Sequence, residues 1–191
     1  TVGGSLAHAD PAAELPAVLL ALGGRCRVRS RSGERWILAD DFYTGLFETA
    51  LGDGDLLVEV ALPEERPSSG WGFHEFARRH GDYALVGVAA TVRLDGRRLR
   101  EVRIALLSVG DGPVRAVGAE KVLDRLDLDD PVARRDALDE AARVTAHHDI
   151  DPPGDLQATP AYRRHLAQVL TRRALDDAVA RALGAPVTSP A

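Results

Sequence analysis

The sequence predicts an α+β fold whose strands and helices are grouped separately in its second half. Three strand-like runs lie there, at residues 73–78, 84–94 and 99–109. Asp95-Gly96 between the second and third runs is a strong tight-turn signal, so the runs predict a three-stranded antiparallel sheet. The apolar residues then take helical spacing, which predicts three helices packed on the sheet, at 114–126, 131–148 and 161–183.

The first part of the chain is expected to begin with a strand end and a helix. Residues 1–5 predict the end of a strand that turns through Gly3-Gly4. Asp10-Pro11 then predicts a helix start, because Asp is a favourable N-cap and Pro fits the first helical turn. The helix body at residues 15–22 is expected to end at Gly23-Gly24, a frequent C-terminal signal.

A β-hairpin and a third strand follow. Residues 25–38 predict the hairpin, with Ser32-Gly33 at its turn. The next segment, residues 39–54, has no clean period and is interrupted by three glycines, so we expect a long functional loop. Residues 56–62 predict a strand that Pro63 ends.

A change of composition divides the chain into two units. The segment PEERPSSG, at residues 63–70, is polar and holds two prolines and a glycine, which is typical of a linker. The expected boundaries are 1–63 for the first unit, 64–71 for the linker, 72–184 for the C-terminal domain and 185–191 for a tail.

Composition excludes several classes of function. A net charge of −5 and a pI of about 5.7 argue against a nucleic-acid-binding surface. Cys26 is the single cysteine, so this chain alone builds no internal disulfide, no four-cysteine zinc site and no iron–sulfur cluster. No apolar run approaches the roughly 20 residues of a membrane-spanning helix. The printed sequence shows no basic-then-apolar leader, so we expect a cytoplasmic protein.

Thr1-Val2-Gly3-Gly4-Ser5 is the first stretch that indicates chemistry. Paired glycines let the backbone approach a bulky group and leave N–H donors uncovered, and the two hydroxyls add further donors. With a helix start nearby, this combination suits a pyrophosphate. Taken alone, a Gly-Gly pair more often marks only a tight turn.

Five segments in order carry a resemblance to a known family. They are TVGGSLAHADPAAELPAVLLALGG from Thr1, ADDFYTGLFETAL from Ala39, DLLVEVALP from Asp55, FARRHGDYALVGVAATV from Phe76 and AYRRHLAQVLTRRAL from Ala161. Together they resemble the FAD-binding medium subunit, or domain, of molybdenum hydroxylases. That family includes the carbon monoxide dehydrogenase medium subunit and the xanthine dehydrogenase flavin domain.

The resemblance implies a fold and a function. Residues 1–63 would form the C-terminal half of a PCMH-type FAD-binding domain, followed by the sheet and three-helix bundle. In the family, an N-terminal subdomain with another glycine-rich FAD motif precedes the segment that begins here, so we expect a piece of a longer flavoprotein. The implied function is that of an FAD-dependent oxidoreductase subunit, which takes electrons from [2Fe–2S] clusters of a partner and passes them to an external acceptor.

The resemblance also implies partners. They are a molybdopterin-binding large subunit and a [2Fe–2S] small subunit, in a dimer of heterotrimers. FAD is the cofactor expected in this chain, whereas the molybdenum cofactor and the clusters belong to the partners. The substrate, whether carbon monoxide, a purine, an aldehyde or an N-heterocycle, is chosen in another subunit.

The family motifs assign ten residues to the FAD site and no catalytic residue or metal ligand. The glycine-rich start matches the pyrophosphate-binding positions, and Glu14 matches the ribose and phosphate region. Leu57 matches an apolar contact beside the flavin, and Tyr83 the aromatic that covers the isoalloxazine. His74 stands where some xanthine dehydrogenases have a flavin-contacting lysine. The full set is Thr1, Val2, Gly3, Gly4, Ser5, Asp10, Glu14, Leu57, His74 and Tyr83.

Two other functions stay open on the sequence alone. The chain could be a structural or assembly module of the same complex that holds no flavin. It could also be a free-standing FAD-dependent oxidase, although no acid–base or substrate constellation supports that. FAD binding discriminates the assembly module from the flavoprotein.

The remaining candidates have simpler explanations. His147-His148 has the residue types of a metal site, but adjacent helical side chains point ~100° apart, so we expect an exposed helix end. Cys26 is expected to be a buried packing thiol. Arg163-Arg164 and Arg172-Arg173 could form ion pairs within the chain or meet another subunit.

Overall fold

The structure is a computed structural model that describes residues 1–79 and 81–184, so the expected tail lies outside the described residues. The elements of the first part are α1 (Val2–His8), α2 (Glu14–Ala21), β1 (Arg25–Ser30), β2 (Gly33–Leu38), α3 (Ala39–Phe42), β3 (Tyr43–Gly45), β4 (Glu48–Thr49) and β5 (Leu56–Ala61). Those of the second part are β6 (Ser69–Ala77), β7 (Ala84–Asp95), β8 (Arg98–Leu107), β9 (Val114–Arg115), α4 (Val117–Val122), α5 (Pro131–Val144), the π-helix η1 (Thr145–Asp149) and α6 (Pro160–Ala182).

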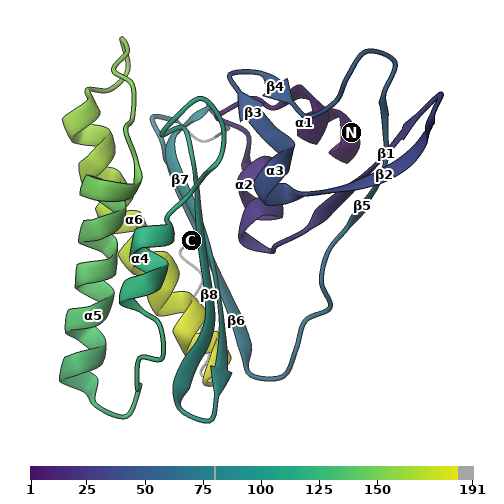
Figure 1. The fold of residues 1–191 in the computed structure, drawn as a ribbon. Helices are drawn as coiled ribbons and strands as arrows, with labels where there is room; N and C mark the ends of the chain where they lie inside the picture. The colour runs from purple at the N-terminus through teal and green to yellow at the C-terminus, as the bar shows by residue number, and fades with distance from the viewer. Residues whose placement is uncertain (80, 185–191) are drawn as a thin grey trace.

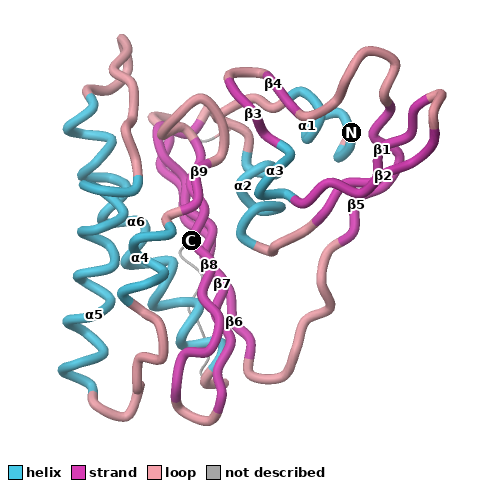
Figure 2. Tube along the Cα trace, viewed as in Figure 1, coloured by secondary structure: helices cyan, strands magenta, loops and turns pink. Residues whose placement is uncertain are grey.

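An antiparallel sheet forms the middle layer of the molecule (Figure 1). Within the described residues its strand order is β6-β7-β8-β9. Helices α4 and α6 cover one face and α5 packs against both of them, while α2 of the first part lies on the other face, against β7 and β8 (Figure 2). A smaller sheet of order β2-β1-β5 belongs to the first part. The predicted α+β fold is confirmed, with β9 added to the three strands that the sequence predicted.

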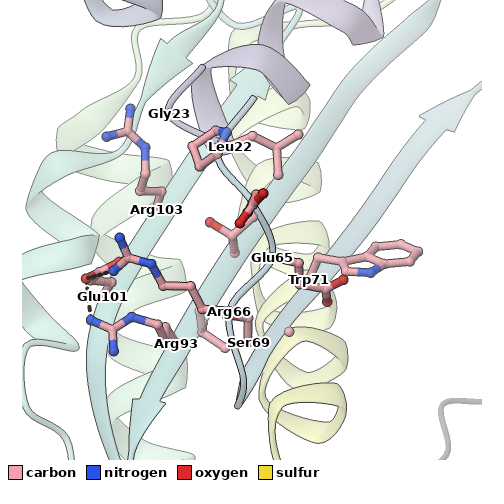
Figure 3. A pocket seen from close by; sticks show the side chains of 14 residues that line it. Leu22, Gly23, Glu65, Arg66, Ser69, Trp71, Arg93, Glu101 and Arg103 are labelled. Atoms are coloured by element: carbon pink, nitrogen blue, oxygen red, sulfur yellow. Dashed lines mark hydrogen bonds and ion pairs between the residues drawn. The ribbon is translucent and has the colours of Figure 1, made fainter. Parts of the chain in front are cut away.

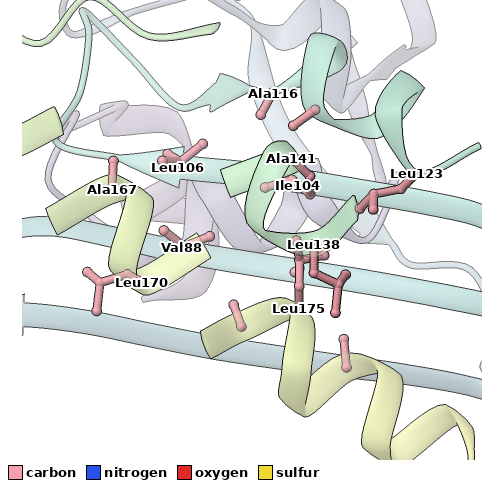
Figure 4. Packing of buried hydrophobic residues seen from close by; sticks show 14 of the residues in the cluster. Val88, Ile104, Leu106, Ala116, Leu123, Leu138, Ala141, Ala167, Leu170 and Leu175 are labelled. Carbon is pink, nitrogen blue, oxygen red and sulfur yellow. The ribbon is translucent and has the colours of Figure 1, made fainter. Parts of the chain in front are cut away.

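The main hydrophobic core lies between the large sheet and its helices (Figure 4). Val88, Ile104 and Leu106 of the sheet cluster with Leu138 of α5 and Leu175 of α6, and each is at most 2% exposed. Complete burial of such a side chain contributes roughly 1.5–3 kcal/mol to stability. These contacts therefore fix α5 and α6 on the sheet.

A second core joins the two parts of the chain. Leu20 of α2 and Phe42 of α3 belong to one buried cluster with Ala89 and Leu107 of the large sheet. Cys26 belongs to this cluster, and burial raises the pKa of its thiol to about 11. The prediction of a packing thiol is confirmed, and the first part is anchored on the sheet by shared apolar contacts.

The expected strand end at residues 1–5 is wrong, because α1 forms there. Thr1 is the N-cap of this helix, and its Oγ1 accepts a hydrogen bond from the Gly4 amide at 3.0 Å. Gly3-Gly4 therefore lies in the first helical turn. The prediction took Gly3-Gly4 as a turn and did not weigh Thr1 as a helix N-cap.

The helix predicted to start at Asp10-Pro11 starts later, at Glu14. Asp10 caps only a turn, in which its Oδ1 accepts a hydrogen bond from the amide of Ala12 at 2.9 Å. Pro16 explains the delay. In a helix begun at Pro11 it would occupy the interior, where proline cannot donate the required hydrogen bond, whereas in α2 it lies in the first turn.

Two further expectations need correction. Residues 39–54 form α3 and the short β3–β4 pair rather than a long loop, and Phe42 is fully buried there. Arg115 in the helix predicted at 114–126 pairs with Ala105 of β8 instead, so α4 spans only Val117–Val122. The exposed helix end at His147-His148 is confirmed, within η1.

Other predicted elements are confirmed. The hairpin at residues 25–38 forms from β1 and β2, and the strand before Pro63 is β5. Gly23 after α2 and Gly96 between β7 and β8 have positive φ angles of 64° and 60°, as a helix stop and a tight turn require.

A chain of ion pairs supplements the shared core at the junction. Asp40 of α3 accepts hydrogen bonds from Arg103 of β8 at 2.7 Å and from Arg115 of β9 at 2.8 Å. Arg103 also donates to the carbonyl of Leu20 at the end of α2, at 2.8 Å from Nη2. Burial alone would raise the pKa of Asp40, but the two arginines outweigh that effect and hold the pKa below its usual value.

We expect this junction to weaken in acid. A carboxylate whose pKa is lower in the folded protein stabilises the fold above its unfolded pKa of about 3.9, and this contribution disappears as the pH falls through the folded value. Asp40→Asn should therefore lower the free energy of unfolding by about 1 kcal/mol at pH 7, after solvent screening of a partly exposed pair, and by much less near pH 3. Urea denaturation at both pH values measures this.

Asp41→Asn is the matched control for that measurement. Asp41 is adjacent and exposed, and no ion pair to it occurs in the described part of the chain. It should change stability little at either pH. Equal losses for the two variants at pH 7 would contradict the role given to Asp40.

Candidate functional site

The N-terminus of α1 presents two backbone donors without protein acceptors. Thr1 uses its hydroxyl for the Gly4 amide and its carbonyl for the Ser5 amide, at 3.0 Å and 2.9 Å. The amides of Val2 and Gly3 precede the first helical hydrogen bond, and no acceptor in the described residues binds them. Such a helix end favours a negatively charged group.

A side chain at Gly3 and one at Gly4 would meet different neighbours. A Cβ on Gly4 would lie 2.8 Å from Thr1 Oγ1, so a side chain there would push the cap away. A Cβ on Gly3 would lie 4.0 Å from Leu57 Cδ2, which places the first turn of α1 directly against β5. The structure thus brings Leu57 together with the glycine-rich start. Leu57 is half-buried, whereas Val2 is 60% exposed.

The segments of Asp10 and Tyr83 are both attached to the end of β8. The amide of Ser108 donates to the carbonyl of Pro11, and its hydroxyl donates to the carbonyl of Ala84, both at 2.8 Å. Tyr83 precedes Ala84 in the β6–β7 connection and is 67% exposed, so its ring is accessible. Asp10, by contrast, uses a carboxylate oxygen within its own turn.

Glu14 and His74 lie on different sides of the large sheet. Glu14 begins α2, and its charge, after the larger effect of burial, helps raise the pKa of Glu75 on β6. His74, the preceding residue on β6, points to the other face, where its Nε2 lies 3.1 Å from Asp177 of α6. The structure does not bring His74 together with the other candidates.

A separate groove of about 420 Å³ lies between the linker, the end of α2 and the large sheet (Figure 3). Its arginines have acidic partners: Arg66 and Arg93 contact Glu101, and Arg103 contacts Asp40. None of the ten expected site residues lines it. We assign no function to this groove.

Nothing in the local sequence selects Ser108, and Arg163 was expected only as a member of an arginine pair. Both residues make hydrogen bonds to segments that are distant in sequence. A serine after a strand gives no local indication of such contacts. Three of the four arginines in the two pairs of α6 form ion pairs within the chain, which was one of the two expectations. They are Arg163 with Asp155, Arg164 with Asp151, and Arg172 with Asp139.

Two kinds of feature are absent from residues 1–79 and 81–184. No group of three or more His, Cys, Asp or Glu side chains is arranged to hold a metal ion there. Nor does any helix in these ranges have the length and apolar character needed to cross a membrane.

Family models match both parts of the chain. The model described as the CO dehydrogenase flavoprotein C-terminal domain matches residues 71–178. The model described as the FAD binding domain in molybdopterin dehydrogenase matches residues 1–65. The range 1–65 contains eight of the ten expected site residues, and the range 71–178 contains the other two, His74 and Tyr83.

Relatives of known function are similar over nearly all of this chain. The nicotine 6-hydroxylase medium subunit of Paenarthrobacter nicotinovorans is 40% identical over 181 residues, which cover 95% of this chain and 61% of the relative. Carbon monoxide dehydrogenase from Hydrogenophaga pseudoflava matches with a TM-score of 0.88 and 30% identity, over 95% of this chain and 61% of that one. Quinoline 2-oxidoreductase from Pseudomonas putida 86 matches with a TM-score of 0.84 and 36% identity, over 96% and 61%. The chain thus spans about 60% of the length of its relatives.

Proposed function

Because the chain belongs to the family of the CO dehydrogenase flavoprotein C-terminal domain, whose model matches residues 71–178, we propose that it is the FAD-binding, electron-transferring part of a molybdenum hydroxylase medium subunit. One observation carries the proposal. The segment that matches the FAD-binding model, residues 1–65, contains the Gly3-Gly4 turn of α1, which lies against Leu57 of β5 and has no side chains to cover its backbone. In this proposal residues 1–63 belong to the flavin-binding unit and residues 72–184 form the C-terminal domain.

The residues at this helix end fit a pyrophosphate. The amides of Val2 and Gly3 would donate to its oxygens, and the helix dipole would favour its charge. Gly3 and Gly4 have no side chains to obstruct the approach of the phosphates. Ser5, in the same turn, supplies a hydroxyl. Thr1 holds the turn in shape, since its own hydroxyl is engaged with the Gly4 amide.

The other residues would hold the remainder of the cofactor. Leu57 would exclude water beside the flavin, and Tyr83 would stack on the isoalloxazine and limit access to it. Asp10 and Glu14 would lie toward the ribose and phosphate region. His74 is the weakest member of the set, because its ring is engaged with Asp177 on the opposite face of the sheet.

FAD, when bound, would supply the redox chemistry, accepting electrons and passing them to an external acceptor. The protein would position the cofactor and tune it through nearby charges. We propose that the electrons come from [2Fe–2S] clusters in a small subunit and that a molybdopterin-binding large subunit oxidises the substrate, in a dimer of heterotrimers. The single cysteine supports this division, since a cluster needs several thiolates. The division is also supported by the similarity to relatives that are themselves medium subunits or medium chains.

Substitutions in the first turn of α1 test the proposal. Thr1→Ala removes the cap, and we expect it to weaken FAD binding by about tenfold, which corresponds to ~1.4 kcal/mol. Gly4→Val should weaken binding further, because its side chain collides with Thr1 Oγ1. Thr1→Ser, which keeps the hydroxyl, should bind nearly as wild type. Fluorescence titration with FAD measures all three.

Thr44→Ala is the matched control, because Thr44 is an exposed threonine on β3. It should leave FAD affinity unchanged. If Gly4→Val bound FAD as tightly as wild type, α1 would not be part of the binding site. If no FAD bound at all, an assembly module without flavin would be favoured.

A further inference from the structure

Ser108 has an unusual backbone conformation at a buried position. It follows β8, is 9% exposed and has a φ of 61°, in the left-handed region that non-glycine residues rarely adopt. Such a conformation is strained and persists only where surrounding contacts require it. The contacts of Ser108 show what requires it.

All three polar groups of Ser108 bind segments distant in sequence. The amide donates to the Pro11 carbonyl at 2.8 Å, and the hydroxyl donates to the Ala84 carbonyl at 2.8 Å. The carbonyl accepts a hydrogen bond from Arg163 Nη1 of α6 at 3.1 Å. One residue therefore connects the α1–α2 connection, the start of β7 and α6.

Two of these segments carry opposite ends of the proposed flavin site. Pro11 lies on the connection that follows α1, whose first turn would bind the pyrophosphate. Ala84 directly follows Tyr83, which would stack on the isoalloxazine. Ser108 joins these two segments, because its amide binds the Pro11 carbonyl and its hydroxyl binds the Ala84 carbonyl.

Arg163 of α6 binds β7 and the end of β8 at this junction. Its guanidinium donates to the carbonyls of both Leu85 and Ser108, and to Asp155 at 2.6 Å. Leu85 follows Ala84, so the strand beyond Tyr83 is held independently of the Ser108 hydroxyl. Loss of that hydroxyl would therefore free the Tyr83 connection while leaving the sheet in place.

We propose that Ser108 is a positioning residue of the flavin site, which sets Tyr83 relative to the N-terminus of α1. This inference rests on the proposed function, since it presumes that FAD binds there. Ser108 does not contact the cofactor in this proposal. It acts through Tyr83.

Ser108→Ala tests the inference, because it removes the hydroxyl and keeps the amide and carbonyl. In the FAD-loaded complete gene product, it should lose most of the flavin fluorescence quenching that Tyr83→Ala loses. Adding Ser108→Ala to Tyr83→Ala should cause no further loss. An undiminished quenching in Ser108→Ala, or an additional loss in the double variant, would overturn the inference.

Ser68→Ala is a closely matched control. Ser68 also has a positive φ, of 60°, but lies exposed in the turn before β6. It should keep full quenching. Ser108→Gly, which also lacks the hydroxyl and tolerates the positive φ, should lose quenching as Ser108→Ala does.

Amide hydrogen exchange separates this inference from the proposed function, because it needs no flavin. Residues 81–86 should exchange faster in Ser108→Ala than in wild type or Ser68→Ala. Unchanged exchange would overturn the inference even if FAD binds. If the wild type bound no FAD, the proposed function and the flavin role of Ser108 would both fail, whatever the exchange showed.

Discussion

Gly72→Ala is expected to destabilise the protein by about 3 kcal/mol, the upper range for an added group in a packed core. Gly72 lies on β6 where the backbone of α6 crosses it, and a Cβ there would lie 2.1 Å from the carbonyl oxygen of Ala174. Backbone cannot move aside as a side chain can, so α6 would have to shift away from the sheet. The shift would open the core around Leu175.

Urea denaturation would measure the effect of Gly72→Ala. Native domains have only about 5–15 kcal/mol of stability, so the expected loss is a large fraction. Gly112→Ala is the control, because the nearest atom to its new Cβ would lie at 3.7 Å, an ordinary contact. A loss below about 0.5 kcal/mol for Gly72→Ala, the usual range for a surface substitution, would show that α6 does not approach β6 this closely.

Arg163→Met should be comparably destabilising, by about 3 kcal/mol, because it leaves buried backbone carbonyls without their hydrogen-bond donor. Arg163 is 5% exposed and satisfies the carbonyls of Leu85 and Ser108 as well as Asp155. Methionine fills much of the space but donates no hydrogen bond, so these acceptors would lose a partner. The midpoint and slope of urea denaturation would report the loss.

Arg164→Met provides the comparison on the same helix. Arg164 pairs at 2.7 Å with Asp151, whose side chain is 96% exposed, and such surface pairs contribute at most about 1 kcal/mol. Its loss should therefore be small. If the two arginine variants were equally stable, burial of Arg163 would not matter as we infer.

Local patterns predicted the elements whose contacts are local. The hairpin at residues 25–38 and the long α6 follow from alternation and helical spacing, which need no distant partner. Residues 39–54 were expected to form a loop because the contacts that order them are distant in sequence. They include the burial of Phe42 in the shared core and the ion pairs of Asp40 with arginines 63 and 75 residues away. Arg115 was misassigned for the same reason, since it joins a strand and an ion-pair chain rather than a helix.

In the candidate site, too, local contacts could be predicted from the sequence and distant contacts could not. Thr1 and Gly4 were found by their local sequence, although as a helix start rather than a strand end. Successive side chains of β6 point to opposite faces of the sheet, and His74 points to the face that α6 covers. A shift of one residue would place it on the other face. Ser108 was not found at all, because its importance comes from three contacts to separate segments and a positive φ.

The most direct measurement is a titration of the complete gene product with FAD, followed by its visible spectrum and fluorescence, alongside the 191-residue chain. We predict saturable binding with one FAD per chain in the complete product, weakened by Gly4→Val and unaffected by Thr44→Ala. The 191-residue chain should bind more weakly, because a pyrophosphate held on one side stays exposed to water. No saturable binding in the complete product, or binding indifferent to Gly4→Val, would contradict the flavin site proposed at α1.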